Sequence, residues 1–198
     1  IWTRSSSLNV NFSTEYITQQ VLAPAFGVTL NNDRYLVARI GPDYATSLPW
    51  GAGLQLGVNL SQGLGGRTEA DAIASGIPLS RLGAGPGFTK ITGNFRVSQP
   101  IQNDVRLDVI GSGQLSLGKP MLRPEQFLLD GPEAVSAFAA GTFNVDQGAT
   151  LRGELVRPFS ARFNAVATTV SPYLFSSVGR GWVFSATSVE PSTITAGA

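Results

Sequence analysis

The side chains that most often carry covalent or metal chemistry are missing from this chain, which has no histidine and no cysteine. Their absence excludes disulfides, thiolate nucleophiles, zinc sites built on Cys or His, and Ser-His-Asp or Cys-His catalytic groups. The remaining acid–base candidates are the carboxylates Glu125 and Asp130, which lie on a turn-rich segment. Because the sequence shows no apolar pocket around them, we interpret both as solvated turn residues.

A nucleotide-binding loop is equally absent. The glycine-rich stretch 63–66 lacks the lysine of a P-loop. Fourteen basic and thirteen acidic residues give a net charge of +1, which leaves no basic field to hold nucleic acid by counterion release. We therefore expect a chain that is not an enzyme, has no catalytic, cofactor or metal site, and binds neither nucleotide nor nucleic acid.

The charged residues that are present fall at alternate positions. Arg106 is followed two residues later by Asp108, and Arg152 by Glu154. Across residues 103–117, apolar side chains occupy one parity and polar side chains the other. A period of two residues is that of a β-strand with two different faces, so these charges are predicted to share the polar face of a sheet.

Similar alternation extends through most of the chain, and within 103–117 only Ile110 departs from it. Strands are expected at residues 8–14, 34–40, 51–60, 90–101, 103–117, 149–159 and 165–177. A run of about 14 residues spans ~46 Å at ~3.3 Å per residue. Such a strand can cross a bilayer even when tilted by ~40°. In contrast, no stretch approaches the ~20 consecutive apolar residues that a membrane-spanning helix needs.

Periodicity alone leaves two folds open, because a soluble antiparallel sandwich also alternates apolar and polar residues. Three features favour a transmembrane barrel. The polar parity carries neighbouring opposite charges, glycines occur inside the strands, and Tyr44, Trp50, Tyr173 and Trp182 fall near strand ends, as in an aromatic girdle. Only 14% of the residues are charged, against about 25% in ordinary soluble domains. The expected fold class is therefore an all-β, antiparallel transmembrane β-barrel.

Two connections, residues 61–87 and 118–148, are too long for simple hairpins and are candidates for function. In and after them the sequence contains PLSRLGAGPGFTKI (78–91), RPEQFLLDGPEAVSAF (123–138), VDQGATLRGEL (145–155) and SPYLFSSVGRGW (171–182). In order and spacing, from Gly51 onward, the chain resembles the two-partner secretion transporters of the hemolysin activator and filamentous hemagglutinin transporter type. These belong to the outer-membrane assembly protein superfamily.

The resemblance implies a sixteen-stranded barrel in the Gram-negative outer membrane, preceded by periplasmic domains. It implies a pore that translocates a secreted client polypeptide of the hemolysin or adhesin type, with that client and outer-membrane lipid as partners. Residues 1–198 would supply part of one barrel domain, roughly half of its strands, with the periplasmic domains and final strands outside this chain. Two alternatives remain: another outer-membrane barrel, such as a porin or a barrel-assembly component, or a secreted soluble β-sheet adhesin.

The resemblance also implies a loop folded back into the lumen, where an arginine in a Val-Arg-Gly-Phe tetrapeptide pairs with an aspartate in a Phe-x-Asp-x-Gly strand. Here Ser136 and Ser177 replace that arginine and aspartate, and Ala137 replaces the glycine. We expect the two serines to share a hydrogen bond, worth ~1 kcal/mol, and to hold the loop less firmly. The loop motif comprises Gly131, Pro132, Val135, Ser136, Ala137 and Phe138, and the docking strand contributes Phe175, Ser177 and Gly179.

The charges on the polar parity are candidates for the lumen wall. They are Arg96, Arg106, Asp108, Arg152 and Glu154. Each has two possible roles, contact with a translocating client or stabilisation of the wall through modest cross-strand pairing. The sequence leaves both roles open.

Overall fold

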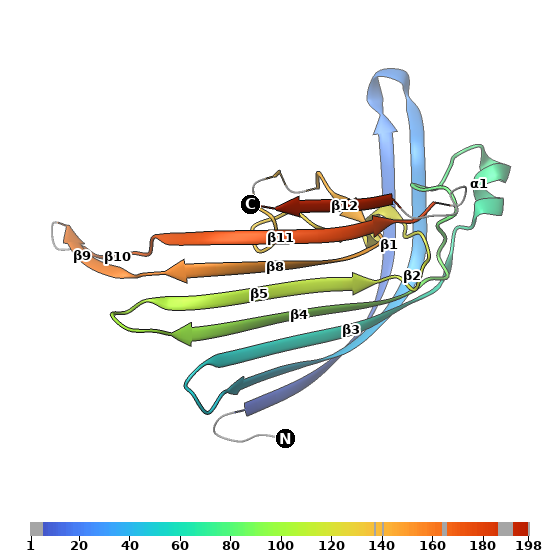
Figure 1. Cartoon of the computed structure of the whole chain (residues 1–198). Helices are drawn as coiled ribbons and strands as arrows, with labels where there is room; N and C mark the ends of the chain where they lie inside the picture. The colour runs from blue at the N-terminus through green and yellow to red at the C-terminus, as the bar shows by residue number, and fades with distance from the viewer. Residues whose placement is uncertain (1–5, 137, 140, 164–165, 186–191, 198) are drawn as a thin grey trace.

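The main element of the fold is one antiparallel sheet of eight strands in the order β1-β2-β3-β4-β5-β8-β11-β12 (Figure 1). A computed structural model describes residues 6–136, 138–139, 141–163, 166–185 and 192–197. The strands of the sheet are β1 (Ser6–Ala23), β2 (Val28–Ser47), β3 (Gly53–Gly66), β4 (Thr89–Pro100), β5 (Arg106–Leu115), β8 (Gln147–Val156), β11 (Tyr173–Val183) and β12 (Ser192–Gly197). This sheet confirms the expected all-β, antiparallel fold class.

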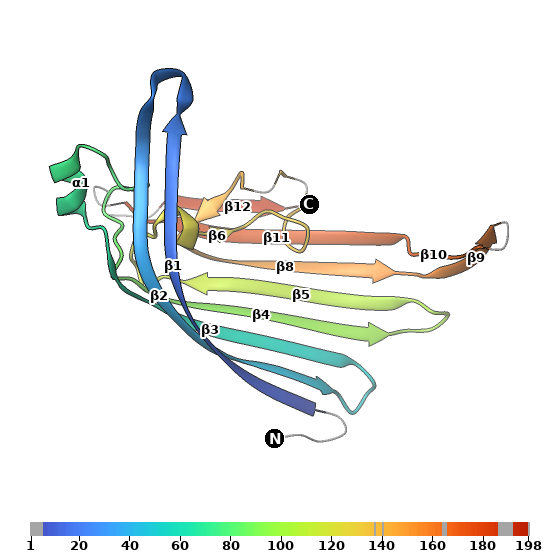
Figure 2. The same ribbon diagram turned by 180° about the vertical axis from the view of Figure 1, so that it is seen from behind.

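The remaining elements lie in the connections. The hairpin β1–β2 turns at the 3-10 helix η1 (Pro24–Phe26) and projects beyond the other strands (Figures 1 and 2). The other elements are α1 (Glu69–Ser75), η2 (Arg123–Glu125), β6 (Phe127–Leu128), β7 (Asn144–Val145), β9 (Phe159–Phe163) and β10 (Val166–Val170). In the described part of the chain, no helix has the length and apolar character needed to span a membrane.

The expected strand and loop boundaries need correction. β1 and β2 are much longer than the alternation at 8–14 and 34–40 indicated, and the stretch 165–177 divides between β10 and β11. The first long connection spans 67–88 and contains α1, whose start is fixed by a capping box between Thr68 and Asp71. The second spans 116–146. Both connections therefore contain short regular elements.

One face of the sheet, here called the outer face, is apolar. The register places Phe12 opposite Ile40, Ile40 opposite Leu60, Leu60 opposite Ile91, and Ile91 opposite Leu115. Residues directly opposite one another share a face, so this row crosses five strands on one side. The exposed apolar residues of the outer face are Leu8, Val10, Phe12, Tyr16, Leu36, Ile40, Tyr44, Leu56, Val58, Leu60, Ile91, Leu115, Leu151, Leu155, Leu174 and Val178.

The opposite face, here called the inner face, is polar and charged. The register pairs Arg39 with Ser61 and Ser61 with Lys90, and it pairs Asp108 with Glu154. Its charged residues are Glu15, Asp33, Arg39, Asp43, Lys90, Arg96, Arg106, Asp108, Arg152 and Glu154. Among the charged residues of the described sheet strands, only Arg34 and Arg180 have the outer parity. The charge pattern of the sequence therefore separates the two faces almost completely.

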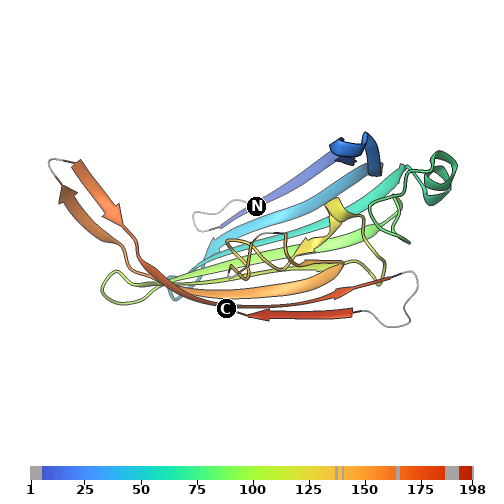
Figure 3. The same cartoon turned by 90° about the horizontal axis from the view of Figure 1, so that it is seen from above.

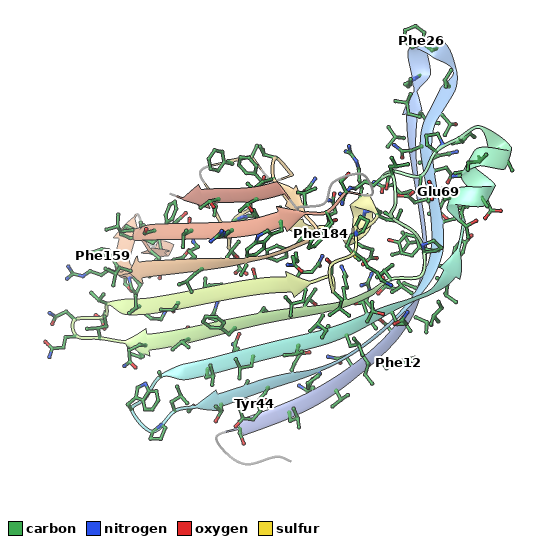
Figure 4. The ribbon with its side chains drawn as sticks, turned by 45° about the vertical axis from the view of Figure 1, so that its right-hand side comes forward. Phe12, Phe26, Tyr44, Glu69, Phe159 and Phe184 are labelled. Carbon is green, nitrogen blue, oxygen red and sulfur yellow. The ribbon has the colours of Figure 1, made fainter. Side chains whose placement is uncertain are left out.

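The two ends of the sheet differ. The turns at 48–52 and 101–105 are short and lie at one end, where Phe159 also lies (Figure 4). The connections 67–88 and 116–146 lie at the other end, marked by Glu69 in the same view. A buried cluster gathers beneath these long connections; it includes Tyr35, Val37, Leu79, Phe88, Met121 and Leu122. The apolar core is therefore at the loop end and not in the middle of the sheet.

The expected aromatic girdle is only partly matched. Tyr44 lies on the outer face near the short-turn end, and Trp182 lies on the outer face near the loop end. Tyr173, however, is the first residue of β11 and shares its parity with Phe175, on the inner face. The girdle expectation was therefore wrong for Tyr173.

Gly111 provides a test of packing on the outer face. A Cβ atom at Gly111 would lie 2.2 Å from Cε1 of Phe95, whose ring covers the glycine across the β4–β5 pair. We expect Gly111→Ala to lower the free energy of unfolding by about 1–3 kcal/mol, because the ring must move. Thermal unfolding measures this. The matched control is Gly153→Ala, also on the outer face, where a Cβ meets nothing within 4 Å. Equal effects of the two changes would contradict this packing.

Candidate functional site

The candidate site is the second long connection, residues 116–146, which we call the inner loop. It leaves β5, returns to β8, and lies on the concave side of the curved sheet (Figure 3). Midway it closes on itself through the β6–β7 pair, in which Phe127 lies opposite Val145. Leu129, Val135 and Val145 are fully buried. The inner loop is therefore packed against the inner face.

Two glycines of β11 let the inner loop approach the sheet. A Cβ atom at Gly179 would lie 3.2 Å from Cγ2 of Val135 and 3.5 Å from Cδ2 of Leu129. At Gly181 a Cβ would lie 2.7 Å from Cγ2 of Val145. A Cβ at Gly181 would force the loop to shift, and a Cβ at Gly179 would fit only tightly, so glycine at these two positions is explained by close approach of another chain segment.

A buried carboxylate fixes the part of the inner loop before β6, which we call its first root; the part after β7 is its second root. Glu125, on η2, is fully buried, and its oxygens accept from Tyr35 Oη at 2.8 Å and Arg39 Nη2 at 2.9 Å. Lys90 Nζ lies 2.8 Å from the other carboxylate oxygen. Burial raises the pKa of Glu125, but the hydrogen bonds and charges of Arg39 and Lys90 outweigh it, so the pKa lies below its usual range. Glu125 therefore ties the loop to β2 and β4 as an anion.

A second buried carboxylate fixes the other root. Asp146 is fully buried and forms an ion pair with Arg81 from the first long connection. It also accepts from the backbone N–H of Met121 at 2.8 Å and of Phe184 at 2.6 Å. Arg81 in turn donates to the carbonyl oxygens of Met121 and Phe184. Asp146 thus joins three connections at the loop end of the sheet.

The tip of the inner loop, by which we mean the segment between β6 and β7, is held by weaker contacts than the two roots. Asp130 accepts from the backbone N–H groups of Gly141, Thr142 and Phe143, which closes the tip on itself. Glu133 forms an ion pair with Arg96 of β4, and both side chains are substantially exposed, so the pair is worth ~0–1 kcal/mol. A cavity of about 470 Å³ separates this part of the tip from the wall of β3, β4 and β5.

Arg152 of β8 provides the polar link between the wall and the tip. Its Nη1 donates to Ser136 Oγ at 2.7 Å and to the carbonyl oxygen of Ala134 at 3.4 Å. Its Nε donates to Glu154 at 2.5 Å, and the guanidinium stacks 3.8 Å from the ring centroid of Phe175. The cation at this contact therefore comes from the barrel wall, whereas the resemblance places it on the loop.

The structure brings most of the predicted site residues together. Gly131 and Pro132 line the cavity at the tip, Val135 is buried, and Phe138 packs edge to face on Phe143 at 4.9 Å. Ala137 lies outside the described residues. The three docking-strand residues and the five predicted charges all have the inner parity; they are Phe175, Ser177, Gly179, Arg96, Arg106, Asp108, Arg152 and Glu154. Arg106 pairs with Asp108 at 2.9 Å.

Two expectations were wrong. Ser136 and Ser177 do not share a hydrogen bond: Ser136 accepts from Arg152, and the buried Ser177 Oγ has no partner among the described residues. Glu125 is not a solvated turn residue, because β2 and β4 enclose it. Asp130 does serve a turn, but it is buried. The error for Glu125 arose because its partners lie far away in the sequence, and the error for Ser136 arose because a different residue of the inner face reaches it.

Several residues that anchor the loop were not predicted as site residues. They are Tyr35, Arg39, Arg81, Lys90 and Asp146. Arg39 and Lys90 have the polar parity of their strands, and this was a usable signal. Ile110 was a second usable signal, because it is the only apolar residue on the polar parity of its strand. It is 7% exposed and lines the cavity under the tip together with Ala134. An apolar residue on a polar face thus marked the area that the loop covers.

Among the described residues, no three His, Cys, Asp or Glu side chains are grouped to hold a metal ion. The arrangement is instead a set of reversible polar and apolar contacts between a loop and a wall.

Comparison with protein families gives a match over residues 3–198 to the family described as haemolysin secretion/activation protein ShlB/FhaC/HecB. This match extends the resemblance to the first two strands. Neither the curated proteins nor the solved structures compared with the chain gave a match.

Asp146→Asn tests the second root. The change removes the anionic partner of Arg81, and breaking a buried pair in this way costs about 3 kcal/mol or more. We expect faster hydrogen exchange throughout residues 116–146. The control is Glu133→Gln, which removes the exposed partner of Arg96 and is expected to cost less than about 1 kcal/mol. If both variants exchange at the wild-type rate, Asp146 does not anchor the loop.

Ser136→Arg tests the link at the tip. Alone, it would place a second guanidinium beside Arg152, and we expect roughly tenfold lower amide protection at the tip. Ser177→Asp would add a carboxylate opposite Arg152 in the strand register, so the double variant is expected to show higher protection than the wild type. Hydrogen exchange of the tip measures both. A double variant without added protection would count against this contact.

Acid should loosen the first root. The pKa of Glu125 is lowered on folding. The stabilisation of the folded loop by ionised Glu125 is therefore complete above the ordinary glutamate pKa of about 4.5, and it is lost as the pH falls through the lower pKa of the folded state. We expect constant loop protection from about pH 7 to pH 5 and a decline below about 4.5. Subtracting the profile of Glu125→Gln isolates this group from other carboxylates. Identical profiles would refute the assignment.

Proposed function

Because the chain belongs to the haemolysin secretion/activation protein family ShlB/FhaC/HecB, the two-partner secretion transporters of the Gram-negative outer membrane, we propose that it translocates a secreted client polypeptide of the haemolysin or adhesin type. The client passes through the lumen of the barrel as an unfolded chain. The observation that carries this proposal is the inner face, which is polar, charged and covered by a loop held only by non-covalent contacts.

The inner face offers a client the contacts that an extended chain needs. Polar side chains line a cavity of about 310 Å³ on the inner face of β1 to β4, among them Asn11, Asn59 and Thr92. They can exchange hydrogen bonds with a moving backbone without a fixed sequence requirement. The charged residues of this face stay on the wall, where each is neutralised by an oppositely charged neighbour. They are Arg96, Arg106, Asp108, Arg152 and Glu154.

The inner loop is the element that must move. Its tip is attached by Arg152 and by the exposed pair of Arg96 and Glu133, whereas its roots are attached by buried ion pairs. We propose that the tip shifts during transport while the roots stay in place. The motif residues Val135, Ser136 and Phe138 then act as a releasable cover on the wall.

We also propose that residues 1–198 form part of one larger barrel domain. In the described residues β1 pairs only with β2, and β12 only with β11. Unpaired strand edges are not tolerated in lipid, since their N–H and C=O groups have no partners there. Further strands at both edges would complete the wall, and the exposed apolar residues of the outer face would contact lipid.

Photo-crosslinking of a stalled client tests the transport path. A benzoylphenylalanine at Asn94, on the inner face, is expected to form adducts with the secreted partner protein during its export. The matched control places the same group at Phe95, one residue on and on the outer face. There we expect adducts with lipid and none with the client.

The readout is the client–transporter adduct detected by immunoblotting in intact cells. Client adducts at Phe95 equal to those at Asn94 would contradict passage along the inner face. Client adducts at neither position, while the client is still secreted, would contradict passage through this wall.

A further inference from the structure

One area of the mainly apolar outer face is polar and carries a charge. It lies where β11 and β12 meet β8, within three residues of the loop end of β11. The register places Arg180 opposite Thr195, and places Trp182 opposite Thr193 on one side and Gln147 on the other. All five residues have the outer parity. We call them the donor patch.

The donor patch is accessible. Arg180, Thr193 and Thr195 are exposed, and Gln147 and Trp182 are partly exposed. The guanidinium of Arg180 lies 5.3 Å from the ring centroid of Trp182, a cation–π contact that orients it along the wall. Among the described residues, no carboxylate lies within ion-pair distance of Arg180. Within the described part of the structure, the guanidinium of Arg180 is exposed and has no anionic partner.

The chemistry of the patch fits an anion. Arginine, the indole N–H, two hydroxyls and a carboxamide all supply hydrogen-bond donors, and directly opposite residues lie only ~4.5–5.5 Å apart. Arginine matches phosphate oxygens especially well, because its planar fork donates two parallel hydrogen bonds. A charged side chain on the lipid face is costly at the bilayer midplane but nearly free at the interface. The patch therefore suits a membrane interface that carries phosphate.

The ends of the sheet indicate which interface this is. Outer-membrane barrels have short turns on the periplasmic side and long loops outside. The patch is at the end with the connections 67–88 and 116–146, so it faces the outer leaflet. Arg34, the other outward cation of the described strands, lies at the same end, where β3 reaches Gly66.

We propose that the donor patch binds a phosphate group of the phosphorylated glucosamine lipid that forms the outer leaflet of the Gram-negative outer membrane. Arg180 forms the ion pair, Trp182 orients it, and Thr193, Thr195 and Gln147 donate further hydrogen bonds. The bound lipid seals the wall beside the second root of the inner loop, because the backbone of Phe184, two residues after Trp182, contacts Asp146. The proposal rests on the location in the membrane and not on client transport.

Native mass spectrometry of the delipidated, full-length transporter in detergent tests the proposal. The probes are bisphosphorylated lipid A, lipid A treated with phosphatase, phosphatidylglycerol and inorganic phosphate. We expect the bisphosphorylated lipid to bind most tightly. Arg180→Gln should weaken it about tenfold, as the loss of one charge-assisted contact predicts, and Arg180→Lys should weaken it less.

The matched control is Arg157→Gln, which removes an exposed arginine stacked on Phe159 at the opposite end of the sheet. It should leave lipid binding unchanged. If Arg180→Gln fails to fold into a heat-modifiable barrel, Trp182→Phe makes the same comparison, because it removes one donor and keeps a ring. Equal binding by wild type and both variants would overturn the proposal. So would equal binding of dephosphorylated lipid, phosphatidylglycerol or free phosphate.

Discussion

Two buried carboxylates determine how the inner loop is held. Glu125 joins one root of the loop to β2 and β4, and Asp146 joins the other root to Arg81 and to the chain that follows β11. Removing either charge would leave buried cations or N–H groups without partners, which is expensive. Between the roots, the tip depends on glycines that permit close packing and on the guanidinium groups of Arg152 and Arg96. Strong attachment at the roots and weak attachment at the tip is what a movable cover requires.

The two faces of the sheet explain why the charges that hold the loop lie where they do. A strand in a membrane barrel must present apolar side chains to lipid, so its charges have only one face on which to lie. Nearly all charges of the described sheet lie on the inner face, and four of them, Arg39, Lys90, Arg96 and Arg152, contact the loop there. The exception that matters, Arg180, lies at the end of the sheet where an interface can solvate it. The alternation of apolar and polar residues in the sequence thus determines both the face that contacts the loop and the face that contacts lipid.

That alternation made the fold predictable. Periodicity identified the sheet, its polar face and the two long connections, because each is a local property of the chain. The contacts of the loop were not predictable in the same way. Glu125 was assigned to solvent because its partners Tyr35 and Lys90 are distant in sequence. The expected bond between Ser136 and Ser177 was wrong because Arg152, a residue already placed on the inner face, reaches Ser136 instead. The odd or even position of a residue in a strand determines the face on which its side chain lies, but not the residue that it contacts.

The tip of the inner loop lies against the inner face of β11, and all its other contacts depend on this placement. Since the natural chain has no cysteine, a disulfide between Val135→Cys and Gly179→Cys measures this directly. The ideal Cβ of Gly179 lies 3.2 Å from Cγ2 of Val135, within reach of a disulfide. We predict rapid and nearly complete oxidation in the outer membrane, and none between Val135→Cys and Gly153→Cys, whose second cysteine is on the outer face. Failure of the first pair to oxidise, or equal oxidation of both pairs, would show that the tip does not lie on β11.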